Sequence, residues 1–253
     1  MNIEINIGGG GIFSKLMLAF QAIDTQILDV NDIESVTFNN VDERIDNEIN
    51  IYEFIYKQTN VEPDNILIPH LGCEVYHDEI PQYNLDRLRI IISKLELNDE
   101  LIISYNEIKK DILNDSGTLG VHVRLGSDMN YWHGDIYGNK YISDYIKAID
   151  EETKKNSYDY VYVACDNEES LSELIKVYGN KIKYHNDFIR SEQVNDDEYN
   201  FLSSNLTNKK MWMDTFIDML LLSECGTLIH RVSNFANMSK IYSKHITNKS
   251  ILI

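Results

Sequence analysis

Hydrophobic and polar residues follow two different periods along this chain, and the period changes several times. Residues 3–7 (IEINI) alternate with a period of two, which predicts a strand. After the glycine run at residues 8–11, apolar residues recur at helical spacing up to Ile27. The chain therefore opens with a strand, a glycine loop and a helix.

Two more helices are expected before residue 115. Residues 83–97 and 98–113 both carry helical patterns, and Asn98 or Asp99 can cap the second helix. The chain's three prolines, at 63, 69 and 81, predict an irregular stretch before these helices. The polar segment NDSGT, residues 114–118, closes this half of the chain.

From residue 118 onward the alternation of strands and helices is regular. Strands are predicted at residues 118–125, 159–166, 181–185 and 226–231, and helices at 141–155, 167–179, 210–225 and 233–244. Such alternation is typical of an α/β protein with a doubly wound parallel sheet. We predict two Rossmann-like domains, residues 1–115 and 116–253, with a cleft between them.

Composition narrows the possible partners. The formal net charge of −18 opposes general attraction to nucleic acid and to anionic membranes, so any phosphate site must be local. No run of about twenty apolar residues is present, and the N-terminus does not resemble a secretory signal. We expect a cytoplasmic protein that binds no nucleic acid and has no membrane span.

The cysteines and histidines predict no metal site. The three cysteines are widely spaced and odd in number, which favours reduced thiols in a core. The seven histidines form no pair with zinc-binding spacing. We therefore expect neither a metal nor a cofactor.

Polar groups interrupt the buried strands where those strands end. His122 and Arg124 share one side of the strand at 118–125, so an acidic partner or an anionic ligand must meet the arginine. Asp166 and Asn167 follow the next strand, and Ser233 and Asn234 follow the strand at 226–231. Each of these last four residues either caps the helix behind it or lines a ligand site at the carboxyl edge of the sheet. Together with Arg124 they describe an anion and nucleotide pocket.

This order of motifs resembles the superfamily of GDP-fucose-using fucosyltransferases, which includes nodulation-type, core α1,6- and protein O-fucosyltransferases. The segments that carry the resemblance are GVHVR (120–124), YVACDN (162–167) and DMLLLSECGTLIHRVSNF (218–235). The glycine run with Gly9, Gly10 and Gly11 is similar to the first loop of the family. The resemblance implies a type B glycosyltransferase fold of two Rossmann-like domains with a short N-terminal half. It places the acceptor on residues 1–115 and the nucleotide sugar on residues 116–253.

The resemblance also implies roles for individual residues. Arg124 would contact the donor diphosphate and stabilise the leaving GDP, and His122 would orient the arginine or the donor. Asp166 would recognise the base, and the glycine loop would belong to the donor site. The start of the last helix would hold phosphate through Ser233, Asn234 and Phe235.

The chain departs from the family pattern at two places. The second arginine of the family's H-x-R-R pattern is Leu125 here. Either the diphosphate is stabilised less strongly than in the family, or Lys15 or Arg231 supplies the missing charge. The segment GSD, residues 126–128, stands where T-D or G-D is usual, so Asp128 aligns only with one inserted residue. Asp128 is our candidate general base, with Asp135 and His133 as alternatives; all three could equally face water.

Further residues have two open interpretations. Tyr131, Trp132 and Tyr137 either stack on a sugar or base or close the domain junction. For Asp218, within an apolar helix, we favour a structural bond to a neighbouring strand or loop over contact with a ligand.

The sequence thus predicts a metal-independent, inverting glycosyltransferase. It would move a sugar, expected to be L-fucose, from a GDP-sugar to a hydroxyl of a glycan or glycoconjugate. The alternative from another class is a catalytically inactive nucleotide-sugar-binding protein. A Rossmann-type cofactor enzyme is less compatible, because residues 8–11 lack the G-x-G-x-x-G spacing.

Overall fold

The computed structural model describes part of the chain in two compact units. The described residues are 2–7, 13, 16, 17, 19, 20, 23, 30–40, 52, 55–57, 82–113, 117–125, 141–190, 209–243 and 249–253. Unit 1 comprises Met1–Ser104, Thr207–Phe216 and Val232–Tyr242, and unit 2 comprises Tyr105–Leu206, Ile217–Arg231 and Ser243–Ile253. The units interleave along the sequence. The division into functional domains at residues 115 and 116 stays a prediction.

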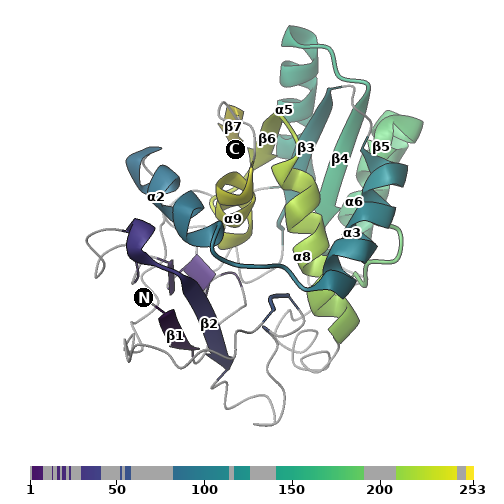
Figure 1. Ribbon diagram of the computed structural model, residues 1–253. Helices are drawn as coiled ribbons and strands as arrows, with labels where there is room; N and C mark the ends of the chain where they lie inside the picture. Colours follow the sequence, from purple (N-terminus) through teal and green to yellow (C-terminus); the bar gives the residue numbers. More distant parts are fainter. Residues whose placement is uncertain are drawn as a thin grey trace. The chain divides into compact units, whose positions relative to one another are not determined.

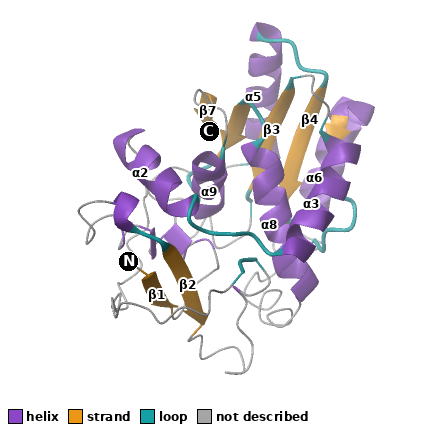
Figure 2. Ribbon diagram, in the orientation of Figure 1, coloured by secondary structure: helices purple, strands orange, loops and turns teal. Residues whose placement is uncertain are grey.

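Unit 2 contains a five-stranded parallel sheet in the order β5-β4-β3-β6-β7, seen in Figures 1 and 2. Its strands are β3 (Thr118–Val123), β4 (Tyr160–Cys165), β5 (Ile182–Lys183), β6 (Thr227–His230) and β7 (Lys249–Leu252). The parallel α/β arrangement predicted from the alternation is confirmed. Strand β7 was not among the predicted strands.

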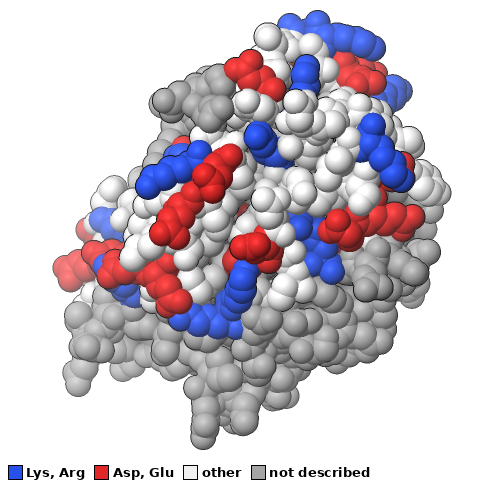
Figure 3. Space-filling model, turned by 90° about the vertical axis from the view of Figure 1, so that its right-hand side faces the viewer, with Lys and Arg blue, Asp and Glu red and all other residues white. Residues whose placement is uncertain are grey.

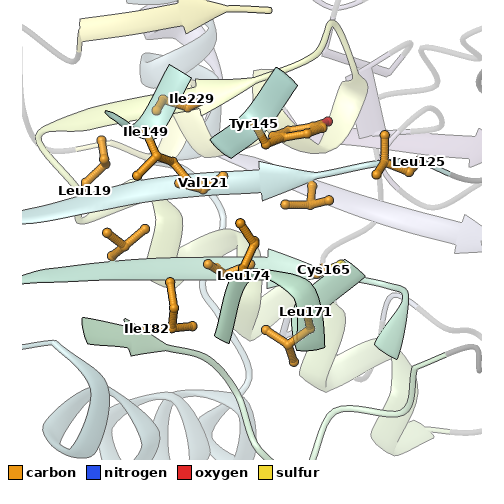
Figure 4. Close-up of a cluster of buried hydrophobic side chains, with 13 residues drawn as sticks. Leu119, Val121, Leu125, Tyr145, Ile149, Cys165, Leu171, Leu174, Ile182 and Ile229 are labelled. Atoms are coloured by element: carbon orange, nitrogen blue, oxygen red, sulfur yellow. The ribbon is translucent and has the colours of Figure 1, made fainter. Parts of the chain in front are cut away.

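One face of this sheet is covered by helices α5 (Ile142–Lys155) and α6 (Glu168–Tyr178). Figure 4 shows the apolar side chains that fill this layer. Alternate residues of β3 point into it, because successive side chains of a strand face opposite ways. The cluster includes Leu119, Val121, Val123, Leu125, Tyr145, Ile149, Leu171 and Leu174. Each large side chain buried there stabilises the fold by roughly 1.5–3 kcal/mol.

The opposite face of β3 meets the end of helix α8 (Lys209–Ser223) and the turn after it. Gly120 lies on this face. A Cβ atom at Gly120 would lie 3.0 Å from the Cβ of Cys225 and 3.2 Å from a methyl of Leu222, closer than ordinary packing allows. The absence of a side chain at Gly120 therefore permits the close approach of the chain around α8.

The predicted helices before residue 115 are also present. They are α2 (Gln82–Ile92) and α3 (Asp99–Ile112). The amide of Glu100 donates to the Asn98 side chain at 3.0 Å, so Asn98 caps α3. Among the described residues, no helix has the length and hydropathy needed to cross a membrane.

Unit 1 contains a parallel pair of strands, β1 (Asn2–Ile7) and β2 (Ser35–Asn40), and the short 3-10 helix η1 (Val30–Asp32). The helix expected after the glycine run is confirmed where it is described, since Leu16, Ala19, Phe20 and Ile23 are helical and buried. Helix α9 (Asn234–Tyr242) packs with α2. The sequence pattern did not predict β2.

Candidate functional site

Arg124 and Asp166 meet at the carboxyl edge of the five-stranded sheet. Each residue directly follows its strand, and the last residues of the two strands, Val123 and Cys165, are neighbours in the parallel register. An Nη1 atom of Arg124 donates to Oδ2 of Asp166. The two side chains are 23% and 32% exposed, so the pair lies partly open to solvent. An acidic partner inside the protein thus meets the arginine that the strand pattern singled out.

Asn167, the residue after Asp166, has a structural role. Oδ1 of Asn167 accepts a hydrogen bond of 2.8 Å from the Ser170 amide, so Asn167 is the N-cap of α6. The thiol of Cys165 donates to the Asn167 carbonyl at 3.2 Å. Burial raises the pKa of this thiol to about 11, which keeps it protonated at neutral pH. Of the two residues that could cap α6, the structure assigns the cap to Asn167.

His122 lies on the same side of β3 as Arg124 and is buried. Its neighbour in the register is His230 of β6. Burial, followed by the nearby charge of Arg124 and by His230, lowers the pKa of His122 well below its usual value. His122 is therefore neutral at physiological pH, which avoids a second positive charge in the interior beside Arg124.

Leu125, at the position of the family's second arginine, lies among apolar residues rather than beside Asp166. Leu125 belongs to the apolar cluster beneath α5 and α6. Arg231, which follows β6, is only 2% exposed, and burial lowers its pKa. The suggestion that Arg231 or Lys15 supplies the missing charge stays a prediction, and Lys15 lies outside the described residues.

The start of α9 carries the third polar segment. The Ser233 hydroxyl accepts from the Ala236 amide at 3.1 Å, and the Asn237 amide donates to the Ser233 carbonyl at 3.0 Å, so Ser233 caps this helix. The ring of Phe235 meets Phe13 edge to face at 4.9 Å. Ser233, Asn234 and Phe235 belong to unit 1, whereas His122, Arg124 and Asp166 belong to unit 2.

Several predicted site residues lie outside the described part of the chain. They are the donor-loop glycines Gly9, Gly10 and Gly11, the base candidates Asp128, His133 and Asp135, and the aromatic residues Tyr131, Trp132 and Tyr137. Their roles stay predictions.

Asp218 makes the structural bond that we favoured. Its Oδ1 atom accepts from the hydroxyl of Tyr162 in β4 at 2.8 Å. The same oxygen lies 3.2 Å from Nδ1 of His185, in the segment after β5. All three side chains are buried. Asp218 therefore joins α8 to the sheet.

Sequence reasoning missed Arg190, whose guanidinium donates to the carbonyl of Cys165 at 3.1 Å. Cys165 immediately precedes Asp166, so Arg190 contacts the backbone next to the Arg124–Asp166 pair. Its partners are backbone carbonyls, which leave no signature in a sequence.

The described surface mixes charges of both signs. On the face shown in Figure 3, Lys and Arg side chains lie among Asp and Glu side chains. Within the described ranges, no three His, Cys, Asp or Glu residues gather in a way that could hold a metal ion. Arg124 provides positive charge at the carboxyl edge of the sheet.

The fold of the chain is similar to that of solved fucosyltransferase structures. The chain is similar to NodZ α1,6-fucosyltransferase soaked with GDP-fucose, with a TM-score of 0.60, 12% identity, and coverage of 96% of this chain and 92% of that one. The NodZ structure from Bradyrhizobium gives a TM-score of 0.55 at 12% identity over 94% and 91% of the two chains. POFUT1 in complex with GDP gives 0.53 at 10% identity over 99% and 97%.

At these identities the likeness concerns the fold, which agrees with the resemblance seen in the sequence. No family model matches the chain. A search of curated proteins by sequence also found no match.

Proposed function

We propose that this protein transfers L-fucose from GDP-fucose to a hydroxyl of a glycan or glycoconjugate. The observation that carries the proposal is the Arg124–Asp166 pair at the carboxyl edge of a parallel sheet, where α/β proteins of this architecture bind their ligands. The similar structures include NodZ soaked with GDP-fucose and POFUT1 in complex with GDP or with GDP-fucose. We further propose a two-domain type B architecture for the whole chain.

The chemistry of the pair suits a leaving nucleoside diphosphate. A guanidinium has five N–H donors in a rigid fork, so Arg124 can bond Asp166 and still address a diphosphate oxygen. The carboxylate fixes the direction of the guanidinium before the ligand arrives. Negative charge grows on the diphosphate as the sugar–oxygen bond breaks. A preorganised cation therefore stabilises the transition state more than the ground state.

Asp166 would contribute a second type of contact. A carboxylate has about four acceptor positions, enough to hold Arg124 and to accept N–H groups of a guanine base. A guanine presents adjacent N–H donors on one edge, whereas the corresponding position of adenine is an acceptor. This complementarity favours GDP over ADP as the carrier.

The proposed reaction needs no metal. Arg124 would supply the positive charge that a divalent ion supplies elsewhere. Turnover should therefore persist at full rate in excess EDTA. Loss of turnover on chelation, restored by Mg²⁺ or Mn²⁺, would contradict this part of the proposal.

A binding protein without catalysis is the second candidate. Leu125 favours it, because the side chain at the family's second arginine position is buried among apolar residues and cannot contribute charge. Such a protein would bind GDP or GDP-fucose through Arg124 and release no fucose or GDP product.

The test compares three proteins: the wild type, Arg124→Ala, and Arg89→Ala as a matched control. The Arg89 side chain is 22% exposed and pairs with Asp86, much as Arg124 pairs with Asp166, but it lies in unit 1 on α2. Thermal shifts with GDP, UDP, ADP and CMP report nucleotide binding. Release of GDP from GDP-fucose, with and without acceptor glycans, reports transfer and hydrolysis.

We expect GDP alone to raise the melting temperature of the wild type and the control. Arg124→Ala should abolish that shift and lower kcat/KM by about 10²–10³-fold, as expected for loss of a charge that stabilises the leaving group. A GDP shift without any GDP release would identify the binding protein. Undiminished turnover by Arg124→Ala would reject the proposed function.

A further inference from the structure

Arg190 contacts the end of β4 and the segment after β5 through three hydrogen bonds and two aromatic rings. Its Nε donates to the Cys165 carbonyl at 3.1 Å. Its Nη1 donates to the Phe188 carbonyl at 3.2 Å, and its Nη2 donates to the His185 carbonyl at 2.8 Å. The guanidinium also lies over two rings, 5.4 Å from the centre of Tyr184 and 5.2 Å from that of Phe188. Three carbonyls and two aromatic faces fix this group in one orientation.

The contact falls where β4 extends past its short neighbour. The β5 register on β4 runs from Val161 and Ile182 to Tyr162 and Lys183. Cys165 lies three residues further along β4, and there the Arg190 side chain donates the hydrogen bond to its carbonyl. Arg190 thus connects the segment after β5 to the end of β4.

That segment is itself anchored to the core. His185, whose carbonyl accepts from Arg190, places its ring against the buried carboxylate of Asp218 at 3.2 Å. Asp218 in turn accepts from Tyr162 of β4. The Cys165 carbonyl is therefore tied through Arg190 and His185 to the interior of unit 2.

We propose that Arg190 is a positioning residue for the nucleotide site. By holding the Cys165 carbonyl, it fixes the backbone of the next residue, Asp166, and so sets the carboxylate opposite Arg124. This inference rests on the proposed function, since it concerns the side chain assigned there to the base. Arg190 acts through Asp166 and makes no contact with the ligand itself.

Lysine is the informative replacement for Arg190. It keeps the positive charge but not the planar fork, so it cannot bond three carbonyls in one geometry. In the proposed site, a misplacement of a positioned group by about 1 Å lowers efficiency by up to about 100-fold. We expect Arg190→Lys to weaken GDP binding about tenfold with a folded protein, and to raise KM for GDP-fucose more than it lowers kcat.

A double-mutant cycle with Asp166→Asn separates positioning from a general loss of structure. If Arg190 works through Asp166, Arg190→Lys should weaken GDP binding less than about twofold once Asp166 is replaced. Losses that multiply in the double variant, or no loss in Arg190→Lys alone, would overturn the inference. Arg89→Lys is the control and should leave GDP affinity unchanged.

Hydrogen exchange tests the contact without any nucleotide. Arg190→Lys should speed amide exchange in residues 165–170 and 184–190 and leave β3 and β6 protected as in the wild type. Unchanged exchange in both segments would overturn the inference even if GDP binds. A wild type that binds no GDP but shows this local change would reject the proposed function while supporting the positioning of Asp166 by Arg190.

Discussion

Asp166 and Asp218 are two carboxylates of unit 2 that differ in their exposure to solvent and in their partners. Asp166 stands at the sheet edge with a side chain 32% exposed and pairs with a permanently charged arginine. Asp218 is 2% exposed and bonds the uncharged hydroxyl of Tyr162 and the ring of His185. The first carboxylate has access to solvent and hence to a ligand. The second is committed to holding a helix against a strand.

Within unit 2, the partly exposed Asp166 therefore has little influence on stability, whereas the buried Asp218 has a large one. A partly exposed ion pair contributes about 0–1 kcal/mol to folding, because water and salt screen it. Removing one partner from a buried hydrogen-bonded network costs about 1–3 kcal/mol, and more where a partner is charged, because the remaining groups stay desolvated without their bonds. Replacing Asp166 should therefore affect ligand binding more than stability, and replacing Asp218 should affect stability more than ligand binding.

The largest expected effect on stability is that of Asp218→Ala. It removes the acceptor of the buried Tyr162 hydroxyl and leaves a cavity, so the free energy of unfolding should fall by about 3 kcal/mol. Urea denaturation measures this change. Asp166→Ala should lower the free energy of unfolding by less than about 1 kcal/mol, and equal losses for the two variants would show that the comparison is mistaken.

Gly120→Ala tests how tightly the chain around α8 packs on the sheet beside this network. The new methyl would lie 3.0 Å from the Cβ and 3.1 Å from the sulfur of Cys225. We expect a loss of about 2 kcal/mol, typical of overpacking. Gly226→Ala is the matched control, because a Cβ there would meet nothing within 4 Å. A Gly120→Ala protein as stable as the control would indicate that the sheet and α8 can move apart at little cost.

The pH dependence of stability should report His122. Burial holds the pKa of His122 below its usual value in the folded state. Below about pH 6.5, His122 therefore binds a proton in the unfolded chain but stays neutral in the folded chain. Its contribution is therefore present above that pH and lost as the pH falls, by up to about 1.4 kcal/mol per pH unit. Urea midpoints between pH 7.5 and 5 measure the slope. His122→Gln should flatten it, and an identical slope would remove His122 as the cause.

A smaller loss than that of Asp218→Ala or Gly120→Ala is expected for the α6 cap. Asn167→Ala removes the side-chain acceptor of the Ser170 amide and should cost about 1 kcal/mol. Asn167→Asp retains an acceptor and should recover most of that loss. Thermal unfolding compares the two variants. GDP affinity should change far less in Asn167→Asp than in Asp166→Asn, although the residues are adjacent.

The sheet edge could be predicted from the sequence because parallel strands bring their carboxyl ends together. Val121 and Val123 alternate with His122 and Arg124, which marked β3 and its polar side. Strand β7 has only four residues, KSIL, and it pairs through the fold rather than through its own pattern. Strand β2, SVTFNN, has six residues with Val36 and Phe38 at alternate positions, and this pattern was not recognised as a strand.

The partners within the site were less accessible to sequence reasoning. Either Asp166 or Asn167 could have capped α6, since both types are good N-caps and they are adjacent. Only the backbone geometry assigns the cap to Asn167 and the ion pair to Asp166. Arg190 could not be found at all, because its hydrogen bonds end on carbonyls that every residue carries.

The interleaving of the two units restricts how this chain can be divided in the laboratory. Helices α3 and α8 each begin in unit 1 and end in unit 2, and unit 1 takes three separate stretches of sequence. A fragment starting at residue 116 would carry Thr207–Phe216 and Val232–Tyr242 without the rest of unit 1. Neither unit is a continuous fragment, so split-protein designs, truncations and domain exchanges between relatives will each have to preserve both helices intact.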